Sequence, residues 1–247
     1  MNPVIPIATA AALALAARSS RRGSAQLDKL TLARFKEKAV ELILSDPKGG
    51  LNHARELWRG LGMGDVPMDL SGVELDQVGL SGVNLSGVNL SGANLSGAEL
   101  EETNLSGANL SGANLMNAWM ALANLKGANL LGANLSRADL SQANLSNAQF
   151  KDAKLEGVIL RYSKTDGKGV NFEGADLREA DCSGADLTNA NLSNADLSGA
   201  ILFSANLSGA TVDDVKWYGA KYNVNCTEWP KGFDPNETKA RPFQMTY

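Results

Sequence analysis

Hydrophobic residues recur at every fifth position through residues 68–222, and small or polar residues fill the positions between them. A clear copy of the unit is Ser81-Gly82-Val83-Asn84-Leu85. If the Leu position is called i, Ala or Val stands at i−2 and Asn or Asp usually at i−1, while Ser and Gly often follow at i+1 and i+2. This period matches neither the turn of a helix nor the two-residue alternation of a strand. It predicts short extended pieces joined by tight corners, because Gly accepts a positive φ and Ser and Asn bond locally to the backbone.

Four such sides would close a coil of about 20 residues, and successive coils would stack at the strand spacing of about 4.8 Å. The Leu at i and the Ala at i−2 would then point inward. Counting four inward positions per coil predicts about seven to eight coils in a rod about 35 Å long. The predicted core contains the Leu residues at position i, among them Leu85, Leu95, Leu105, Leu115, Leu125, Leu135, Leu145, Leu187, Leu197 and Leu207.

The repeat resembles the pentapeptide-repeat family, whose consensus is Ala-(Asp/Asn)-Leu-x-x. The resemblance implies an all-β solenoid, a right-handed quadrilateral β-helix; the handedness and the square section come from the resemblance and not from the period. The string Trp-Pro-x-Gly-Phe-Asp-Pro at residues 229–235 resembles an ending of bacterial, particularly cyanobacterial, members, which suggests a cyanobacterial or plastid origin. Some members mimic duplex DNA and bind type II topoisomerases such as gyrase, and these often dimerise through their C-terminal end.

Four segments are expected: a leader at 1–26, a helical cap at 27–66, the β-helix at 67–222 and a tail at 223–247. In the leader, an apolar run at 4–17 precedes three Arg residues. At this length it is short for a membrane span, which needs about 20 residues. Three readings stay open: a leader with no role in the fold, a cleaved targeting segment, or a membrane-associating segment that keeps the rod on the cytoplasmic or stromal side.

Two helices are predicted before the repeat. Leu32, Phe35, Ala39, Leu42 and Ile43 are spaced by three and four residues, which indicates an amphipathic helix from about residue 28 to a stop before residue 47. A second, shorter helix is expected over 51–59. An uncovered strand edge invites pairing with other chains, so we expect these helices to cap the first coil. A partner-docking helix pair is the alternative, and the aromatic tail is expected to form an irregular cap at the other end.

The period breaks over residues 161–171. The inward position after Leu160 is Phe172, twelve residues later instead of ten. The two extra residues are expected to bulge outward in a basic loop that contains Lys164 and Lys168. A tolerated surface insertion and a recognition loop are both open readings.

Most outward i−1 positions carry Asn, so the faces should be neutral ladders. DNA mimicry needs a long negative surface in place of phosphates. Acidic residues gather only beyond the break, in a candidate acidic patch of Asp176, Asp181, Asp186, Asp196, Glu173 and Glu179. A candidate partner patch consists of outward apolar residues, Trp119, Met116, Leu122 and Leu131. Scattered exposed hydrophobic residues are the alternative reading of this second set.

Charge and composition point away from catalysis. Residues 1–67 carry 10 basic and 6 acidic side chains, whereas residues 68–222 carry 10 and 18. The single His and the two Cys, with no Cys-x-x-Cys, predict no catalytic, metal or cofactor site. We expect a non-catalytic structural or protein-interaction module whose partner is an unknown protein and not nucleic acid. The alternative is a gyrase-binding DNA mimic, and a homodimer through the C-terminal end stays open.

Overall fold

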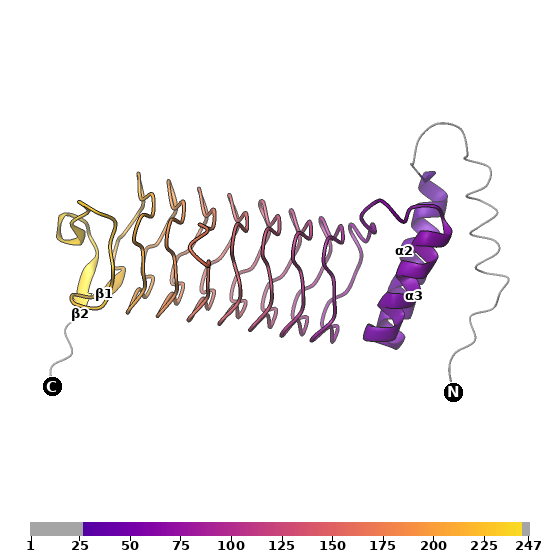
Figure 1. The fold of residues 1–247 in the computed structure, drawn as a ribbon. Helices are drawn as coiled ribbons and strands as arrows, with labels where there is room; N and C mark the ends of the chain where they lie inside the picture. The colour runs from indigo at the N-terminus through magenta and orange to yellow at the C-terminus, as the bar shows by residue number, and fades with distance from the viewer. Residues whose placement is uncertain (1–26, 244–247) are drawn as a thin grey trace.

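The computed structural model describes residues 27–243 as a rod of stacked coils with two helices beside its N-terminal end (Figure 1). Each side of a coil pairs in parallel with the side twenty residues later, as Asp69 pairs with Asn89 and Asn89 with Asn109. Four five-residue sides therefore complete one coil, as the period of the sequence predicted. Each coil is joined to the next by backbone hydrogen bonds of 2.6–3.3 Å, for example from Leu70 N–H to Asn89 O at 2.7 Å.

The outward i−1 residues define four faces, named A to D in chain order around the coil. Face A carries Asn84, Asn104, Asn124, Asn144 and Lys164, followed by Asp186, Asn206 and Glu228. Face B carries Asp69, Asn89, Asn109, Asn129, Gln149, Asn171, Asn191 and Thr211. Face C carries Glu74, Asn94, Asn114, Asn134, Lys154, Asp176, Asp196 and Lys216. Face D carries Gly79, Glu99, Trp119, Asp139, Ile159, Asp181, Ile201 and Lys221.

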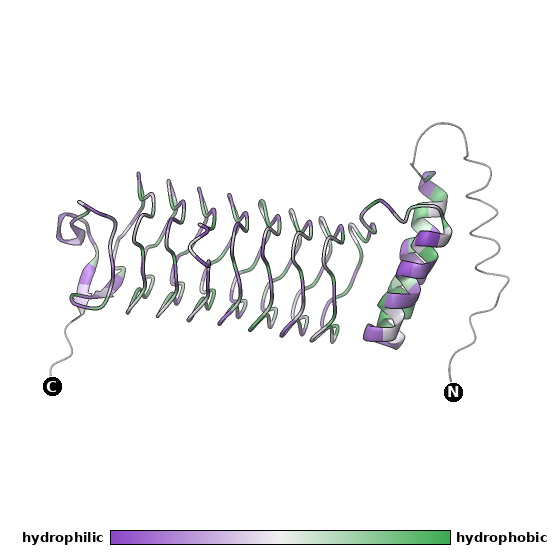
Figure 2. Cartoon of the chain, viewed as in Figure 1, coloured by the Kyte–Doolittle hydropathy of each residue, from purple (hydrophilic) through white to green (hydrophobic). Residues whose placement is uncertain are grey.

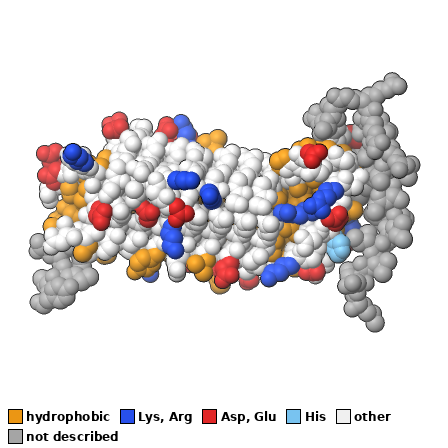
Figure 3. Space-filling model, in the orientation of Figure 1, with side chains coloured by type: hydrophobic (Ala, Val, Ile, Leu, Met, Phe, Trp, Pro, Cys, Tyr) orange, Lys and Arg blue, Asp and Glu red, His pale blue; other side chains and the backbone are white. Residues whose placement is uncertain are grey.

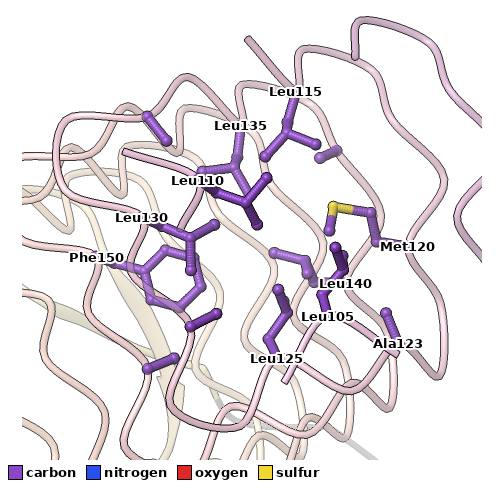
Figure 4. Packing of buried hydrophobic residues seen from close by; sticks show 14 of the residues in the cluster. Leu105, Leu110, Leu115, Met120, Ala123, Leu125, Leu130, Leu135, Leu140 and Phe150 are labelled. Atoms are coloured by element: carbon purple, nitrogen blue, oxygen red, sulfur yellow. The ribbon is translucent and has the colours of Figure 1, made fainter. Parts of the chain in front are cut away.

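Inward side chains stack in columns along the rod axis. Figure 4 shows Leu110, Leu130 and Phe150 in one such column, with Leu105 and Leu125 in another. All ten Leu residues of the predicted core are buried. A fully buried Leu is worth roughly 1.5–3 kcal/mol relative to exposure, so the columns supply the main stabilisation of the rod. Figure 2 shows hydrophobic and hydrophilic residues alternating along the coils.

Every corner from Leu70 to Trp217 places its i+2 residue in the left-handed region. Gly82 has φ of 67°, which costs Gly nothing. Some corners carry a larger residue there, and Leu122 has φ of 61°. A Leu in this conformation is strained by about 1–2 kcal/mol relative to Gly.

The first helix, α2, spans Lys29–Ser45 and agrees with the helix that the apolar spacing predicted. The side chain of Asp28 accepts a hydrogen bond from Thr31 N–H and so caps the start of this helix. Phe35 of α2 packs against Trp58 of the second helix, with ring centroids 4.8 Å apart.

The second helix, α3, spans Pro47–Gly60, so the prediction of a helix over 51–59 was wrong in its start. Asp46 caps the helix by accepting Gly49 N–H, and Pro suits the first turn because that turn lacks N–H partners. Gly50 is buried, and a Cβ there would lie 2.0 Å from Leu42 O. The glycine therefore allows α3 to pass close to the end of α2. The sequence analysis had placed the start of the second helix after this glycine.

The break in the period is narrower than the predicted 161–171. Thr165 is fully buried at an inward position, and its neighbour Lys164 pairs with Asn144 in the ordinary register. The extra residues thus follow Thr165 and lie within 166–169. The hydroxyl of Thr165 donates to the Asp186 carboxylate at 3.1 Å, which is why a polar residue is accepted inside.

The solenoid also extends beyond the predicted end at residue 222. Glu228 pairs with Asn206 on face A, and Leu207 N–H donates to Glu228 O at 2.7 Å. Trp229 then takes the inward position, seven residues after Tyr222, the same step that separates Thr165 from Phe172. Strand β1, Lys221–Asn223, pairs in parallel with β2, Arg241–Phe243, twenty residues later. A short 3-10 helix, η1, spans Pro235–Glu237.

Four aromatic rings gather at this end: Trp217, Tyr222, Trp229 and Phe233, with centroid distances of 5.1–5.6 Å between contacting pairs. Neither α-helix within residues 27–243 is long and apolar enough to cross a bilayer. The apolar run at 4–17 lies outside the described residues.

Candidate interaction surface

The Asn ladders satisfy most of their own hydrogen bonds. Asn109 Nδ2 donates to Asn89 Oδ1 at 3.0 Å, and Asn129 Nδ2 donates to Asn109 Oδ1 at 3.1 Å. Each of these Oδ1 atoms also accepts the N–H two residues later, such as Ser91 N–H to Asn89 at 3.2 Å. The Asn runs are neutral, as the sequence predicted, and the structure adds that they are bonded to one another along the rod. Figure 3 shows the visible side of the rod as largely uncharged, with separate charged side chains on it.

Face D departs from this pattern at Trp119. Its backbone pairs in register with Glu99 on one neighbouring coil and Asp139 on the other. The ring points outward, and 59% of the residue is exposed. An exposed Trp is unusual on a rod with so few aromatic residues, and Trp is enriched among the residues that dominate binding energy at interfaces.

Met116 and Leu122 lie at the two corners that flank face D on the same coil as Trp119, and both are exposed. We call Met116, Trp119 and Leu122 the apolar row. Leu131 is also exposed, but it lies at the corner between faces B and C, where its carbonyl accepts Gly112 N–H. The structure thus brings three of the four predicted patch residues together and leaves Leu131 on the other side of face C.

An acidic row borders the apolar row on the coil toward the N-terminus. Glu99 lies directly beneath Trp119, and Glu102 beneath Leu122. The coils are joined here by Leu100 N–H to Trp119 O at 2.6 Å and Glu102 N–H to Ala121 O at 3.0 Å. Both carboxylates are exposed, and within residues 27–243 neither forms an ion pair or hydrogen bond. We call Glu99 and Glu102 the acidic row.

The candidate acidic patch beyond the break is spread around the rod. Asp176 and Asp196 lie on face C, Asp181 on face D and Asp186 on face A. Glu173 and Glu179 lie at corners. Because these positions face in three directions, they do not form one continuous negative surface.

Most of these carboxylates also have cationic partners. Arg178 contacts Asp176 at 2.7 Å, and Lys151 contacts Glu173 at 2.9 Å. The hydrogen bonds from Arg178 lower the pKa of Asp176 below its ordinary value.

Asp181 and Asp196 are paired as well. Arg161 contacts Asp181 at 2.6 Å, and Lys216 contacts Asp196 at 3.4 Å. Burial alone would raise the pKa of Asp181, but the hydrogen bonds from Arg161 and Ser183 outweigh it and lower that pKa. These charges are therefore locally balanced.

The N-terminal end carries a contact that the sequence analysis missed. The first coil, 69–86, has no earlier coil to donate N–H groups to its carbonyls. Lys36 Nζ of α2 donates to Ser71 O at 2.7 Å, and an Arg55 guanidinium N–H of α3 donates to Asn84 O at 2.7 Å. The only sequence signal was that these two cations lie beside the buried residues Phe35 and Ala54.

Neither cysteine is placed for chemistry. Cys182 takes an inward Leu position, and burial raises the pKa of its thiol to about 12. Cys226 is exposed, and both thiols are free. Across residues 27–243, no three His, Cys, Asp or Glu side chains gather closely enough to hold a metal ion.

Several pentapeptide repeat proteins of known structure are similar to this chain. No curated protein sequence matches the chain. HetL, a pentapeptide repeat protein involved in heterocyst differentiation regulation from the cyanobacterium Nostoc sp. strain PCC 7120, is 25% identical, over 71% of this chain and 87% of HetL, with a TM-score of 0.44. The pentapeptide repeat protein alr5209, also from Nostoc PCC 7120, is 31% identical over 51% of this chain and 84% of its own, with a TM-score of 0.33.

Full-length QnrB1, a plasmid-mediated fluoroquinolone resistance protein, is 16% identical over 72% of this chain and 92% of its own, with a TM-score of 0.38. The family model for pentapeptide repeats matches residues 84–118, 122–161, 168–202 and 180–216, which together span half of the 247 residues. The chain therefore belongs to the pentapeptide-repeat family, whose fold is a right-handed quadrilateral β-helix.

Proposed function

We propose that this protein is a non-catalytic interaction module that presents the apolar row of face D to a protein partner. The observation that carries the proposal is the continuity of Met116, Trp119 and Leu122 across one face and its two corners. Elsewhere the outward positions of faces A to C are mostly Asn residues that bond to one another along the rod. Exposed apolar patches rimmed by polar residues mark interaction sites on soluble proteins.

Backbone strain at Leu122 supports the same reading. Gly is common at the i+2 position of this repeat and is free of strain there, as at Gly112 and Gly127. Leu122 accepts the left-handed φ and is half exposed, so burial does not compensate for its strain. A residue that is unfavourable for the fold but completes an apolar row is the kind of departure expected at a functional position.

The rest of the chain supports the rod. We propose that α2 and α3 cap the first coil through Lys36 and Arg55, and that the aromatic cluster around Trp229 caps the last. On this reading the solenoid has about seven to eight coils between the two caps. Membrane association through residues 4–17, with the rod on the cytoplasmic or stromal side, and a homodimer through the C-terminal end also remain proposals.

A gyrase-binding DNA mimic is the weaker candidate. Mimicry of the phosphate backbone needs a continuous negative surface. The acids beyond the break lie on three faces, and Arg161, Arg178 and Lys216 neutralise three of them. No observation favours this function over the interaction module.

The test is recovery of cellular partners by the tagged full-length chain and two variants. Trp119→Ala removes the centre of the apolar row, and Leu131→Ala is the matched control because Leu131 is similarly exposed on another part of the rod. We expect proteins recovered by the wild type to be lost with Trp119→Ala and kept with Leu131→Ala, at equal thermal stability. Equal recovery by all three proteins would contradict the proposal.

A further inference from the structure

We propose that the partner segment that docks on face D is basic, and that it places a Lys or Arg side chain on the ring of Trp119 beside the carboxylates of the acidic row. This inference rests on the proposed function and names the chemistry of the partner. A segment that mixes Arg or Lys with aliphatic residues would cover Met116 and Leu122 at the same time.

The register of the coils sets the geometry. Glu99 pairs directly with Trp119, so the two residues are separated by one strand spacing of about 4.8 Å. A cation is attracted to a Trp ring when it lies within about 6 Å of the ring centroid, and more strongly than to Tyr or Phe. A long cationic side chain on the N-terminal side of Trp119 would therefore be within reach of both the ring and a carboxylate.

The surrounding charges place the cation on that side of the ring. Toward the C-terminus, Arg137 lies at the corner of the next coil, and Arg161, which is paired with Asp181, also interacts electrostatically with Asp139. Asp139 further accepts Ser141 N–H at 2.8 Å. The carboxylate of Asp139 is therefore already partly balanced.

Toward the N-terminus, the carboxylates beside Trp119 are not balanced by nearby cations within residues 27–243. Glu101 bonds to Ser81 at 2.8 Å, and Lys48 of α3 lies beside Gly82, one coil beyond Glu102. Lys48 forms no ion pair with Glu99 or Glu102 in the described part of the chain. The acidic row therefore keeps two unpartnered negative charges next to the exposed Trp119.

These charges select against other partners. A neutral or acidic segment laid over the apolar row would strip water from Glu99 and Glu102 without replacing their hydrogen bonds, which is unfavourable. A basic segment supplies that replacement and gains the contact with the ring. The combination thus favours basic partners both by attraction and by exclusion.

The test measures binding of synthetic peptides to the full-length protein by calorimetry. The probe is a nine-residue peptide that alternates Leu and Arg, and the comparison peptide carries Gln in place of every Arg. The double variant Glu99→Gln/Glu102→Gln removes the acidic row while keeping its size. The control Asp213→Asn/Asp214→Asn removes two exposed charges from the last coil.

We expect the Arg peptide to bind the wild type and the control equally. The Glu99→Gln/Glu102→Gln variant should bind about tenfold more weakly and with a smaller dependence on salt, since about 1.4 kcal/mol corresponds to a tenfold change. The Gln peptide should bind the wild type no better than that variant does. Equal binding of the Arg and Gln peptides, unchanged binding by the variant, or no binding of the Arg peptide would each overturn the basic-partner inference.

Failure of this inference and failure of the proposed function are distinguishable. If recovery of the cellular partner depends on Trp119 but not on Glu99 and Glu102, the proposed interaction module is supported and the inference of a basic partner is contradicted. If recovery depends on none of the three residues, both the proposed function and the inference of a basic partner are contradicted.

Discussion

The guanidinium of Arg55 donates a hydrogen bond of 2.7 Å to the backbone carbonyl of Asn84, in the place where later coils have a backbone N–H. One coil further on, Asn104 O accepts Leu85 N–H at 2.7 Å. Lys36 replaces a backbone donor at Ser71 O in the same way. The helices thus supply cationic donors to an open strand edge.

Removal of both donors should loosen the first coil. We expect Lys36→Ala/Arg55→Ala to lower the free energy of unfolding by about 1–3 kcal/mol, because two carbonyls lose charge-assisted partners, and the one at Ser71 is partly shielded from water. Amide hydrogen exchange should accelerate in residues 69–86 before the rest of the rod. Lys38→Ala is the control, since Lys38 forms its ion pair with the exposed Glu41 of its own helix and not with the first coil. Equal effects of the two changes would argue against capping.

A charge in a Leu column should be far more damaging than the same change on the surface. Leu125 is fully buried, so Leu125→Asp places a carboxylate in a narrow apolar interior with no partner. We expect it to unfold or aggregate the protein, as followed by circular dichroism during heating. Leu131→Asp, at an exposed corner, should leave the melting temperature within a few degrees. A merely local effect of Leu125→Asp would contradict the inward assignment.

Leu122→Gly should separate stability from binding. The left-handed φ of 61° suits Gly, so we expect the free energy of unfolding to rise by up to about 1 kcal/mol. The same change removes one end of the apolar row and should weaken partner recovery. The control is Gln142→Gly, at the equivalent corner of the next coil with φ of 59°. The Gln142→Gly change should stabilise the rod similarly without weakening partner recovery. Normal partner recovery by the Leu122→Gly variant would show that Leu122 does not belong to the interaction surface.

Cys182 should make stability fall at alkaline pH. Its thiol has a folded pKa of about 12, above the ordinary value of 9.0, because burial disfavours the thiolate. The folded state therefore keeps its proton where the unfolded state loses it. The stabilisation is complete below pH 9 and is lost as pH rises toward 12. Chemical denaturation from pH 8 to 10.5 should show a smaller decline for Cys182→Ala than for the wild type, and parallel curves would count against a buried thiol.

Gyrase should be unaffected by this protein. In a supercoiling assay with purified gyrase, we expect the same rate with and without micromolar protein, because four of the six acids in the candidate acidic patch are paired with cations and the patch faces in three directions. An Arg161→Ala/Arg178→Ala variant is a useful comparison, since it removes the ion pairs of Asp181 and Asp176 and leaves their negative charges unbalanced. Inhibition by the wild-type protein would restore the DNA-mimic alternative.

Much of the fold follows from the sequence because the repeat is local and one-dimensional. Each Leu at position i has one inward role, and residues twenty apart must share a face once four sides close a coil. Glu99, Trp119 and Asp139, which are twenty residues apart in turn, therefore pair in register along one face. Predictions failed where a polar residue took an inward place. Thr165 is stabilised there by Asp186, which is 21 residues away, and apolar periodicity carries no signal for such a contact.

The C-terminal end shows the same limit. Thr227-Glu228-Trp229 forms another side of the solenoid. A count of inward positions at every fifth residue misses this side, because Trp229 follows Tyr222 by seven residues and an inward Thr replaces the usual Ala or Val. The hydroxyl of Thr227 donates to Leu202 O at 2.8 Å, just as that of Thr103 donates to Leu80 O at 2.7 Å. The earlier Thr103 was a usable signal that Thr is accepted at i−2.

The sequence alone determined the coil, its inward columns and the residues on each face, because these depend only on position along the repeat. Only the tertiary structure decided which surface residues lie together. It joined Met116 and Leu122 to Trp119, separated Leu131 from them, and dispersed the acids that are close in sequence around three faces. The reason is geometric: a square coil turns the chain by a quarter at every fifth residue. Neighbours in sequence then face different directions, and true surface neighbours lie one coil apart.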